Sequence, residues 1–330
     1  GGNSLARPGS EENRFPAVLM LLDSRNGEVI AADTMPDGRE SYMSPLCFPQ
    51  PGSDEWTVVF GTGGETIDGN LYVARLSDLK NGKLSQAKVI ATESNHGFIA
   101  PPSAADINGD DVYDIVAISH GSKVVAIDGK DHRILWERTF AGTECSNSFA
   151  VGYFTDDDTP DFFTFISKGV WPNSTGTLQV MIDGRTGQVA FMDSIGCTGY
   201  SSPVVYDLNH DGTDEAIISV NEFDCSVGFA GRTPVQMTSR LITIDFQRNA
   251  IGTIDQAGGF KNIFSTPWIG DLDDDGYLDI VHCQYYHYSD LLSFLGMRVK
   301  RIDTPVRIKA DPIWNSYMGA EGKGVFMSRN

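Results

Sequence analysis

The chain has 330 residues, of which 41% are hydrophobic, so it is long enough to bury a large core as one all-β domain or as two smaller domains. Its 44 acidic residues against 25 basic ones give a formal net charge of -19, which repels nucleic acids and anionic membrane surfaces. No stretch approaches the roughly 20 consecutive apolar residues that a membrane-spanning helix needs. We therefore predict no nucleic-acid partner and no membrane insertion.

The first residues of the chain are polar. Residues 1–15 are therefore expected to form a flexible leader. The opening Gly1-Gly2-Asn3-Ser4 has none of the charged and apolar regions of a signal peptide. From residue 16 onward, no linker rich in Pro and Ser and no run of like charges interrupts the sequence. We therefore predict a single domain over residues 16–330.

A two-part pattern recurs along the chain with a period of roughly 45–65 residues, close to the length of a propeller blade. Its latter part is a short apolar run, an acidic residue, a turn that contains Gly or Asn, and a second apolar run. Such a sequence predicts a β-hairpin, because Gly and Asn tolerate the positive φ of a tight turn. In chain order, the copies are LLDSRNGEVIAA (21–32), the looser LYVARLSDLKNGKL (71–84), VVAIDGKDHRILWE (124–137), LQVMIDGRTGQVAFM (178–192) and LITIDFQRNAIGTI (241–254).

The first part of the pattern predicts two more strands, joined by an acidic loop. It is clearest in SAADINGDDVYDIVAIS (103–119), SPVVYDLNHDGTDEAIISV (202–220) and TPWIGDLDDDGYLDIVHC (266–283). Together the two parts make a four-stranded unit, so the sequence predicts an all-β fold, a β-propeller of four-stranded blades. The blades are expected near residues 41–91, 100–143, 146–197, 200–257 and 264–310.

Residues 16–38 supply only the latter half of one more blade. If residues 311–330 complete this half-blade, the propeller has about six blades. Alternatively, the chain is the C-terminal part of a propeller with about seven or eight blades. We favour the first interpretation.

Three acidic loops share the pattern D-x-[DN]-x-D-x-x-x-[DE], with side-chain oxygens at positions one, three, five and nine and a backbone carbonyl at position seven. Such a loop can wrap a hard cation with about six to eight oxygen ligands, and calcium fits best. Zinc would call for His or Cys ligands, and magnesium usually keeps several waters. We therefore predict about three calcium ions. The expected ligands are Asp106, Asn108, Asp110, Val112 and Asp114 in the first loop, Asp207, Asn209, Asp211, Thr213 and Glu215 in the second, and Asp271, Asp273, Asp275, Tyr277 and Asp279 in the third.

These loops begin like an EF-hand but differ from it at the twelfth position, which holds Ala117, Ile218 or His282 in place of a bidentate Glu. The flanking segments are also predicted strands, so EF-hand sensing is excluded. The remaining alternative is that the acidic residues only solvate the turns. A fourth, degenerate loop (residues 153–161) keeps Asp157 and Asp161 but has Tyr and Thr at positions one and three, so we expect weak calcium binding there or none.

The segments ADINGDDVYDIV, YDLNHDGTDEAI and GDLDDDGYLDIV resemble FG-GAP or VCBS repeats, the units of integrin-α-like propellers. The hairpin halves are similar to the repeats of PQQ-like propellers. The resemblance covers most of residues 16–290. It implies that the calcium loops join the first two strands of a blade and act structurally, while partners meet the opposite face or attached domains.

From this resemblance we expect an exported protein, at the cell surface, outside the cell or in the periplasm. Its expected function is that of a calcium-stabilised, non-catalytic binding, adhesion or assembly module. It would recognise a protein or a glycan, as one part of a larger surface complex. The alternative is a carbohydrate-active enzyme, such as a polysaccharide lyase or hydrolase, or a quinoprotein-like enzyme, although the chain lacks the adjacent cysteines typical of alcohol-oxidising quinoproteins.

One cluster resembles an enzyme or transition-metal site, the segment HCQYYHYSD with His282, His287 and Asp290. The simpler interpretation is that these histidines end a blade strand. The neighbouring Tyr285, Tyr286 and Tyr288 could form a binding surface. Four tryptophans are instead expected to pack between blades: Trp56, Trp136, Trp171 and Trp268.

The five cysteines are widely spaced and form no CxxC pair, which excludes zinc ribbons and thioredoxin-like motifs. Cys145 and Cys197 precede successive blades at equivalent positions, so we predict a Cys145–Cys197 disulfide, with Cys225–Cys283 as a second pair. Burial as free thiols is the alternative. Asn173-Ser174-Thr175 is a glycosylation sequon, which has meaning in a eukaryotic secretory host.

Overall fold

The computed structural model describes residues 7–10, 12–171, 173–227, 236–287 and 294–327. Contacts between residues divide the chain into two compact units, Gly1–Ala141 and Gly142–Asn330. Strands dominate both units, and no helix within the described ranges is long and apolar enough to cross a membrane. The single domain expected over residues 16–330 stays a prediction.

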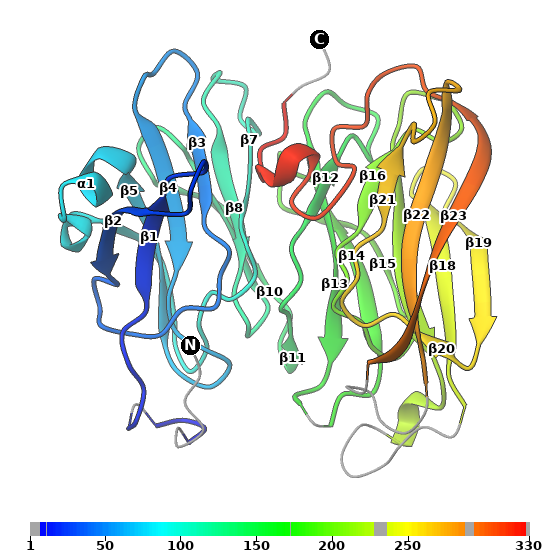
Figure 1. Cartoon of the computed structure of the whole chain (residues 1–330), viewed down its shortest axis with the longest axis horizontal. Coiled ribbons are helices and arrows are strands. Elements are labelled where there is room, and N and C mark those ends of the chain that lie inside the picture. Colours follow the sequence, from blue (N-terminus) through cyan, green and yellow to red (C-terminus); the bar gives the residue numbers. More distant parts are fainter. Residues whose placement is uncertain (1–6, 11, 172, 228–235, 288–293, 328–330) are drawn as a thin grey trace. The chain divides into compact units, whose positions relative to one another are not determined.

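The described residues of the first unit form three antiparallel sheets, each drawn from a continuous stretch of chain (Figure 1). Within the described residues, the first sheet has two strands, β1 and β2. The second has the order β3-β4-β5-β6 and the third the order β10-β9-β8-β7. The bounds are β1 (Val18–Leu22), β2 (Val29–Thr34), β3 (Leu46–Pro49), β4 (Trp56–Gly61), β5 (Gly69–Arg75), α1 (Leu76–Lys80), η1 (Leu84–Gln86), β6 (Lys88–Glu93), β7 (Ser103–Ala105), β8 (Asp114–Ile118), β9 (Lys123–Ile127) and β10 (Ile134–Thr139).

In the second unit, the part of the chain that the structure describes also forms three antiparallel sheets (Figure 1). In two of them, the short strands β11 and β20 add a further pairing to the long second strand of the blade, β13 or β22. The bounds are β11 (Thr143–Glu144), β12 (Ala150–Gly152), β13 (Asp161–Lys168), β14 (Thr177–Ile182), β15 (Val189–Asp193), β16 (Val204–Tyr206), β17 (Glu215–Glu222), η2 (Cys225–Val227), β18 (Thr238–Asp245), β19 (Ala250–Gly258), β20 (Phe260–Lys261), β21 (Trp268–Gly270), β22 (Tyr277–Tyr286), β23 (Leu295–Arg307) and η3 (Ala320–Gly322).

The inner strands of the sheets are buried on both faces. All five residues of β8 are buried, whereas the outer strand β10 contains exposed residues. Continuous apolar runs such as DIVAI are typical of strands covered on both sides. In the second unit, Val204, Ile217 and Leu241 of one sheet form a core with Ile269 and Ile280 of the next. Neighbouring sheets therefore pack face to face.

Consecutive four-stranded antiparallel sheets that pack face to face are the blades of a β-propeller. The predicted fold class, all-β with four-stranded propeller blades, is confirmed. Counting the two-stranded sheet, the described residues form six sheets, in agreement with the prediction of about six blades.

The stretch 71–84 differs from its prediction as a simple hairpin. A short helix, α1, and the 3-10 turn η1 stand between β5 and β6. The Arg75 guanidinium pairs with the Asp78 carboxylate at 2.9 Å in the first helical turn, and Leu79 and Leu84 are buried in the core. Leu79 and Leu84, which the sequence pattern assigns to a hairpin, therefore anchor a helical connection in the core.

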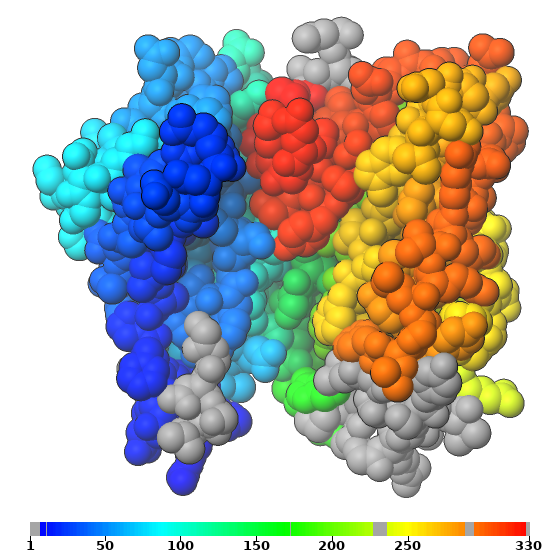
Figure 2. Space-filling view, in the orientation of Figure 1, coloured from blue at the N-terminus to red at the C-terminus, as the bar shows by residue number. Residues whose placement is uncertain are grey.

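Part of the C-terminal segment pairs inside the second unit, and completion of the half-blade of residues 16–38 by residues 311–330 stays a prediction. The Val205 amide donates to the Trp314 carbonyl at 2.9 Å, and the Ile269 amide donates to the Asn315 carbonyl at 3.0 Å. These bonds satisfy edge groups of β16 and β21, and the Trp314 side chain is buried there. Figure 2 shows the segment in red on the surface of the second unit.

Residues 1–6 and 11 of the predicted leader lie outside the described residues. Next to them, Arg14 donates from Nε to the Ser10 carbonyl at 2.8 Å, and its guanidinium pairs with the buried Glu40 carboxylate. This part of the leader is therefore anchored to the first unit by an ion pair.

Candidate metal centre

The three acidic loops occupy the same place in three sheets, between the first and second strands of the blade. The first (106–114) joins β7 to β8, the second (207–215) joins β16 to β17, and the third (271–279) runs from β21 into β22. Positions four and six of every loop have a positive φ, which only Gly, Asp, Asn or His commonly adopts. These residues are Gly109 and Asp111, His210 and Gly212, and Asp274 and Gly276. The loops therefore share one backbone conformation.

The carboxylate at position one organises each loop by accepting backbone N–H groups. Asp106 accepts from positions four, five and six, at 2.7, 3.3 and 2.9 Å. Asp207 accepts from positions five and six at 3.1 Å each, and Asp271 does so at 3.0 and 2.8 Å. Short-range bonds of this kind hold an acidic side chain over its own loop.

Position five is held in the same way. Its carboxylate accepts the N–H of position seven in all three loops, at 3.1, 3.0 and 2.9 Å. This bond holds the backbone at the amide of position seven, and the carbonyl of the same residue is the predicted backbone ligand. The residues at position seven are Val112, Thr213 and Tyr277.

The closing carboxylate at position nine is buried in each loop and accepts the N–H of position two. Asp114 accepts from Ile107 at 3.1 Å, Glu215 accepts from Leu208 at 2.7 Å, and Asp279 accepts from Leu272 at 2.9 Å. Burial raises the pKa of Asp114 to about 6 and that of Glu215 to about 7. A buried carboxylate of this kind is stabilised in its charged form by a neighbouring cation.

The third loop brings its carboxylates closest together. One oxygen each of Asp271, Asp273 and Asp275 lies within 4.8 Å of the others. Arg301 of β23 reaches the same loop, where its guanidinium pairs with Asp273 and lies 3.2 Å from Asp279. The third loop is therefore the best-formed carboxylate cluster, and it already faces one protein cation.

Sequence reasoning missed an aspartate that lies at the end of the third blade strand and faces the loop. Asn108 of the first loop lies 3.4 Å from the Asp128 carboxylate, and Asn209 of the second lies 3.5 Å from Asp245. The signal was present in the hairpin copies, where Asp follows Ile in AIDGK and TIDFQ. Each hairpin also carries an arginine beside its loop: Arg133 pairs with Asp128 at 3.1 Å, and Arg248 pairs with Asp245 at 2.7 Å and with Asp211 of the second loop at 2.9 Å.

The degenerate loop uses its acidic residues for internal hydrogen bonds. The Asp161 carboxylate accepts the amide and hydroxyl of Thr155 at 2.8 and 2.9 Å and the Gly184 amide at 3.0 Å. Burial raises its pKa to about 6. Asp157 accepts the Thr159 amide at 2.7 Å. Because the degenerate loop lacks carboxylates at positions one and three, we still predict weak calcium binding at Asp157 and Asp161, or none.

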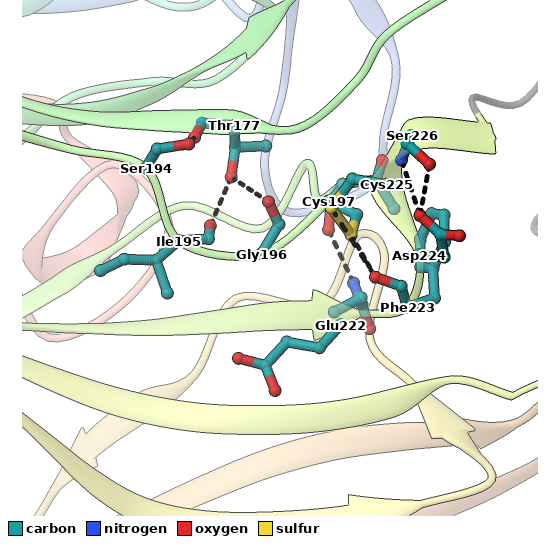
Figure 3. The surroundings of a disulfide bond; sticks show 12 residues. Thr177, Ser194, Ile195, Gly196, Cys197, Glu222, Phe223, Asp224, Cys225 and Ser226 are labelled. Carbon is teal, nitrogen blue, oxygen red and sulfur yellow. Dashed lines mark hydrogen bonds between the residues drawn. A yellow bond between two sulfur atoms is a disulfide. The ribbon is translucent and has the colours of Figure 1, made fainter.

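The predicted disulfides are wrong, because the structure pairs Cys197 with Cys225, with Cα atoms 5.1 Å apart (Figure 3). The Cys197 amide donates to the Asn221 carbonyl at 2.8 Å, which sets Cys197 beside the end of β17. The chain then turns back at η2, which places Cys225 next to Cys197. The other predicted members, Cys145 and Cys283, are free thiols, and Cys145 is buried.

The proposed cluster of His282, His287 and Asp290 stays a prediction, because only part of it lies within the described residues. The buried His282 side chain points to Asp255 of β19, with Nε2 3.2 Å from the carboxylate. Burial lowers the pKa of His282, which keeps it neutral. Asp290 and Tyr288 lie outside the described residues. Tyr285 packs against Phe294 and Tyr286 against Phe260, at centroid distances of 5.3 and 4.4 Å.

The tryptophans differ in how far their side chains are exposed. Trp136 is buried, as expected for packing between blades, but Trp56 is 43% exposed and Trp171 is 47% exposed. The packing prediction is therefore wrong for Trp56, which begins the inner strand β4, and for Trp171, which lies in the loop between β13 and β14.

No protein-family model matches the sequence, and a comparison with curated proteins finds no relative. The FG-GAP or VCBS resemblance therefore stays a prediction. Among solved structures, the chain is similar to the WD40 domain of Toxoplasma gondii coronin, with 12% identity and a TM-score of 0.47, over 91% of this chain and 67% of that one. It is also similar to Kuenenia stuttgartiensis hydrazine synthase, with 11% identity and a TM-score of 0.49, over 82% of this chain and 70% of that one. BamB of Moraxella catarrhalis has 10% identity and a TM-score of 0.40, over 90% of this chain and 87% of that one. Likenesses of this strength carry no information on activity or partner.

Proposed function

We propose that this chain is a calcium-stabilised, non-catalytic binding module on a β-propeller scaffold, acting outside the cytosol. The observation that carries the proposal is the repetition of one loop conformation, with the same carboxylate arrangement, in three sheets. A solvated turn needs no such repetition of acidic side chains at positions one, five and nine. The resemblance to FG-GAP or VCBS repeats supports the same interpretation.

The donor chemistry fits calcium. Each loop offers several carboxylates with a carbonyl at position seven, all oxygen donors, and none of its proposed ligands is a His or Cys. Calcium takes about six to eight oxygen ligands in flexible geometry, which suits a loop closed by one buried carboxylate and by others that are partly or fully exposed. When bound, the ion would supply charge neutralisation. The chain's own residues orient the carboxylates and join two strands of a blade.

The Cys197–Cys225 disulfide supports a location outside the cytosol, because structural disulfides persist in oxidising compartments. A calcium concentration high enough to fill moderate-affinity loops is also found outside cells. A rigid propeller with a strongly acidic surface would then present its connecting loops to a protein or glycan partner within a larger surface complex.

The test is a calcium titration of metal-stripped protein by isothermal calorimetry, with magnesium as the competing ion. We expect about three ions per chain and a loss of about one ion in each of the variants Asp106→Ala, Asp207→Ala and Asp271→Ala. Asp157→Ala in the degenerate loop is the matched control and should leave the stoichiometry unchanged. Absence of calcium binding by the folded chain, or equal losses in the control, would overturn the proposal.

A further inference from the structure

The hairpin turn between the third and fourth strands of a blade has the same backbone arrangement in three sheets. It begins with an aspartate whose carboxylate accepts the amide of the fourth turn residue, at 3.2, 2.8 and 2.8 Å. The fifth turn residue has a positive φ in each case. The aspartates are Asp128, Asp183 and Asp245, and the fifth residues are His132, Gly187 and Asn249. The three turns can therefore be compared residue by residue.

Each hairpin turn lies against the acidic loop of its own blade. The Gly129 amide donates to the carboxylate of Asp114, position nine of the first loop, at 2.8 Å. In the blade with the degenerate loop, the Gly184 amide donates to Asp161 at 3.0 Å. A charged side chain on the turn is thus well placed to act on the loop.

The fourth turn residue differs in charge from blade to blade. It is Asp131 beside the first loop, Thr186 beside the degenerate loop and Arg248 beside the second loop. The turns at the first and second loops therefore carry opposite charges at one position of the same backbone.

Arg248 reaches the second loop from this position. Its Nη1 lies 2.7 Å from the Asp245 carboxylate and 2.9 Å from the carboxylate of Asp211, which is position five of the loop and a proposed calcium ligand. The Arg248 side chain is 55% exposed, so it can leave Asp211 without opening the core. The guanidinium already neutralises part of the charge that calcium would neutralise.

The first loop has no such contact within the described part of the chain, where no Lys or Arg side chain pairs with Asp106, Asp110 or Asp114. The nearby Arg133 pairs instead with two residues of the hairpin turn, Asp128 at 3.1 Å and Asp131 at 3.6 Å. The first loop therefore keeps its full negative charge.

The first and second loops are otherwise closely matched. Each has Asp at positions one and five, Asn at position three and a buried carboxylate at position nine. Residues 106–114 and residues 207–215 each contain four acidic residues and neither Lys nor Arg. Charge within the loops does not separate them, whereas charge on the hairpin turn does.

A cation beside a calcium ligand opposes calcium in two ways. It repels the ion, and its pairing with the carboxylate must be broken or shared before that carboxylate can coordinate. A carboxylate at the same place has no pairing to break, and its charge attracts the ion. The effect is moderate because solvent and salt partly screen charges at the surface.

We propose that the fourth turn residue tunes the calcium affinity of the adjoining loop, so that Arg248 makes the second loop bind calcium about tenfold more weakly than the first. This inference rests on the proposed function, because it requires that both loops bind calcium. Without calcium, Arg248 is the counter-cation of the second loop. As the calcium concentration rises, the first loop fills first, and Asp211 then exchanges the guanidinium for the ion.

The test is a titration of the metal-stripped chain with calcium alone, followed by NMR of one glycine amide in each loop. Gly109 reports on the first loop and Gly212 on the second. We expect the Gly109 signal to reach its midpoint at about tenfold lower free calcium than the Gly212 signal. Signals that move with equal midpoints would overturn this inference alone. Signals that do not move would overturn the proposed function as well.

Variants of the hairpin turn assign the difference to its fourth residue. Arg248→Gln should lower the calcium midpoint of Gly212 by about tenfold, and the reciprocal Asp131→Arg should raise that of Gly109 by a similar factor. Arg248→Lys keeps the charge and should stay closer to the unaltered chain than Arg248→Gln. In each variant the other loop is the internal control, since an unchanged midpoint there also shows that the chain is folded. An unchanged or higher Gly212 midpoint in Arg248→Gln would contradict the proposal.

Discussion

Tyr153 and Asp214 tie two neighbouring sheets together by a pair of hydrogen bonds. The Tyr153 amide donates to the Asp214 carboxylate at 2.8 Å, and the Asp214 amide donates to the Tyr153 carbonyl at 2.7 Å. Asp214 is position eight of the second acidic loop. In the first unit, Tyr113 at the same position exchanges bonds of 2.9 and 3.0 Å with the side chain of Gln50. In both cases, position eight of an acidic loop makes a pair of hydrogen bonds to the preceding sheet.

Replacement of Asp214 tests this tie. Asp214 is buried, and Asp214→Ala would leave the Tyr153 amide without its acceptor, so we expect a loss of about 1–3 kcal/mol in the free energy of unfolding. Urea denaturation measures it. Asp156→Ala, an exposed acidic residue of the adjoining degenerate loop, should cost less than about 0.5 kcal/mol. Equal losses in the two variants would show that the tie has no particular role.

Arg301 should compete with calcium in the third loop. Its guanidinium pairs with Asp273 and lies 3.2 Å from Asp279, so a bound ion would have to share or displace it. We expect Arg301→Gln to raise the calcium affinity of this loop by about tenfold or more, because a like charge at contact distance is removed. Lys309→Gln removes the same charge at an exposed position after β23 and is the control. A weaker affinity in Arg301→Gln would mean that the arginine organises the loop.

Cys145 should be inert in the folded protein. Its thiol is buried, and burial raises its pKa to about 12, so almost none is thiolate at neutral pH. Alkylation with iodoacetamide, followed by peptide mass analysis, should modify Cys145 only after unfolding. The same digest, left unreduced, should contain the Cys197–Cys225 cross-link. Modification of native Cys145 at the rate of a free thiol would contradict its burial.

His282 should make stability depend on pH. Burial lowers its pKa below the unfolded value of about 6.5, although Asp255 opposes the shift and Lys300 and Arg298 add to it. As pH falls through about 6.5, the unfolded chain takes up a proton that the folded protein resists, so stability decreases until the folded pKa is reached. His282→Gln should reduce this decrease, measured by denaturant unfolding at about pH 7 and pH 5. An identical pH dependence in the variant would exclude His282 as its source.

The strands and the loops follow from local patterns, and for that reason the sequence predicts them. Continuous apolar runs such as DIVAI predict buried inner strands, and the spacing of Asp106, Asp110 and Asp114 predicts a loop whose carboxylates turn inward. The structure bears out the sheets, and the three acidic loops share positive φ at positions four and six.

Contacts between distant segments could not be predicted in this way. Cys145 and Cys197 occupy equivalent positions in the repeat, but pairing depends on where the chain after β17 returns, and that brings Cys225 to Cys197. Trp314 lies far from β16 in sequence, and no local pattern predicts that its backbone pairs with Val205. The hairpin aspartates, such as Asp128, were visible in the repeat but needed the fold to place them beside a loop.

Thermal unfolding with calcium and with excess chelator, together with metal analysis of the purified chain, tests the central claim most directly. If the acidic loops hold calcium, the protein should contain about three ions, and chelation should lower the Tm by about 10 °C or more, because the carboxylates of each loop would then repel one another. An unchanged Tm in chelator and a metal-free protein would mean that the loops are only solvated turns, and that calcium has no part in this fold.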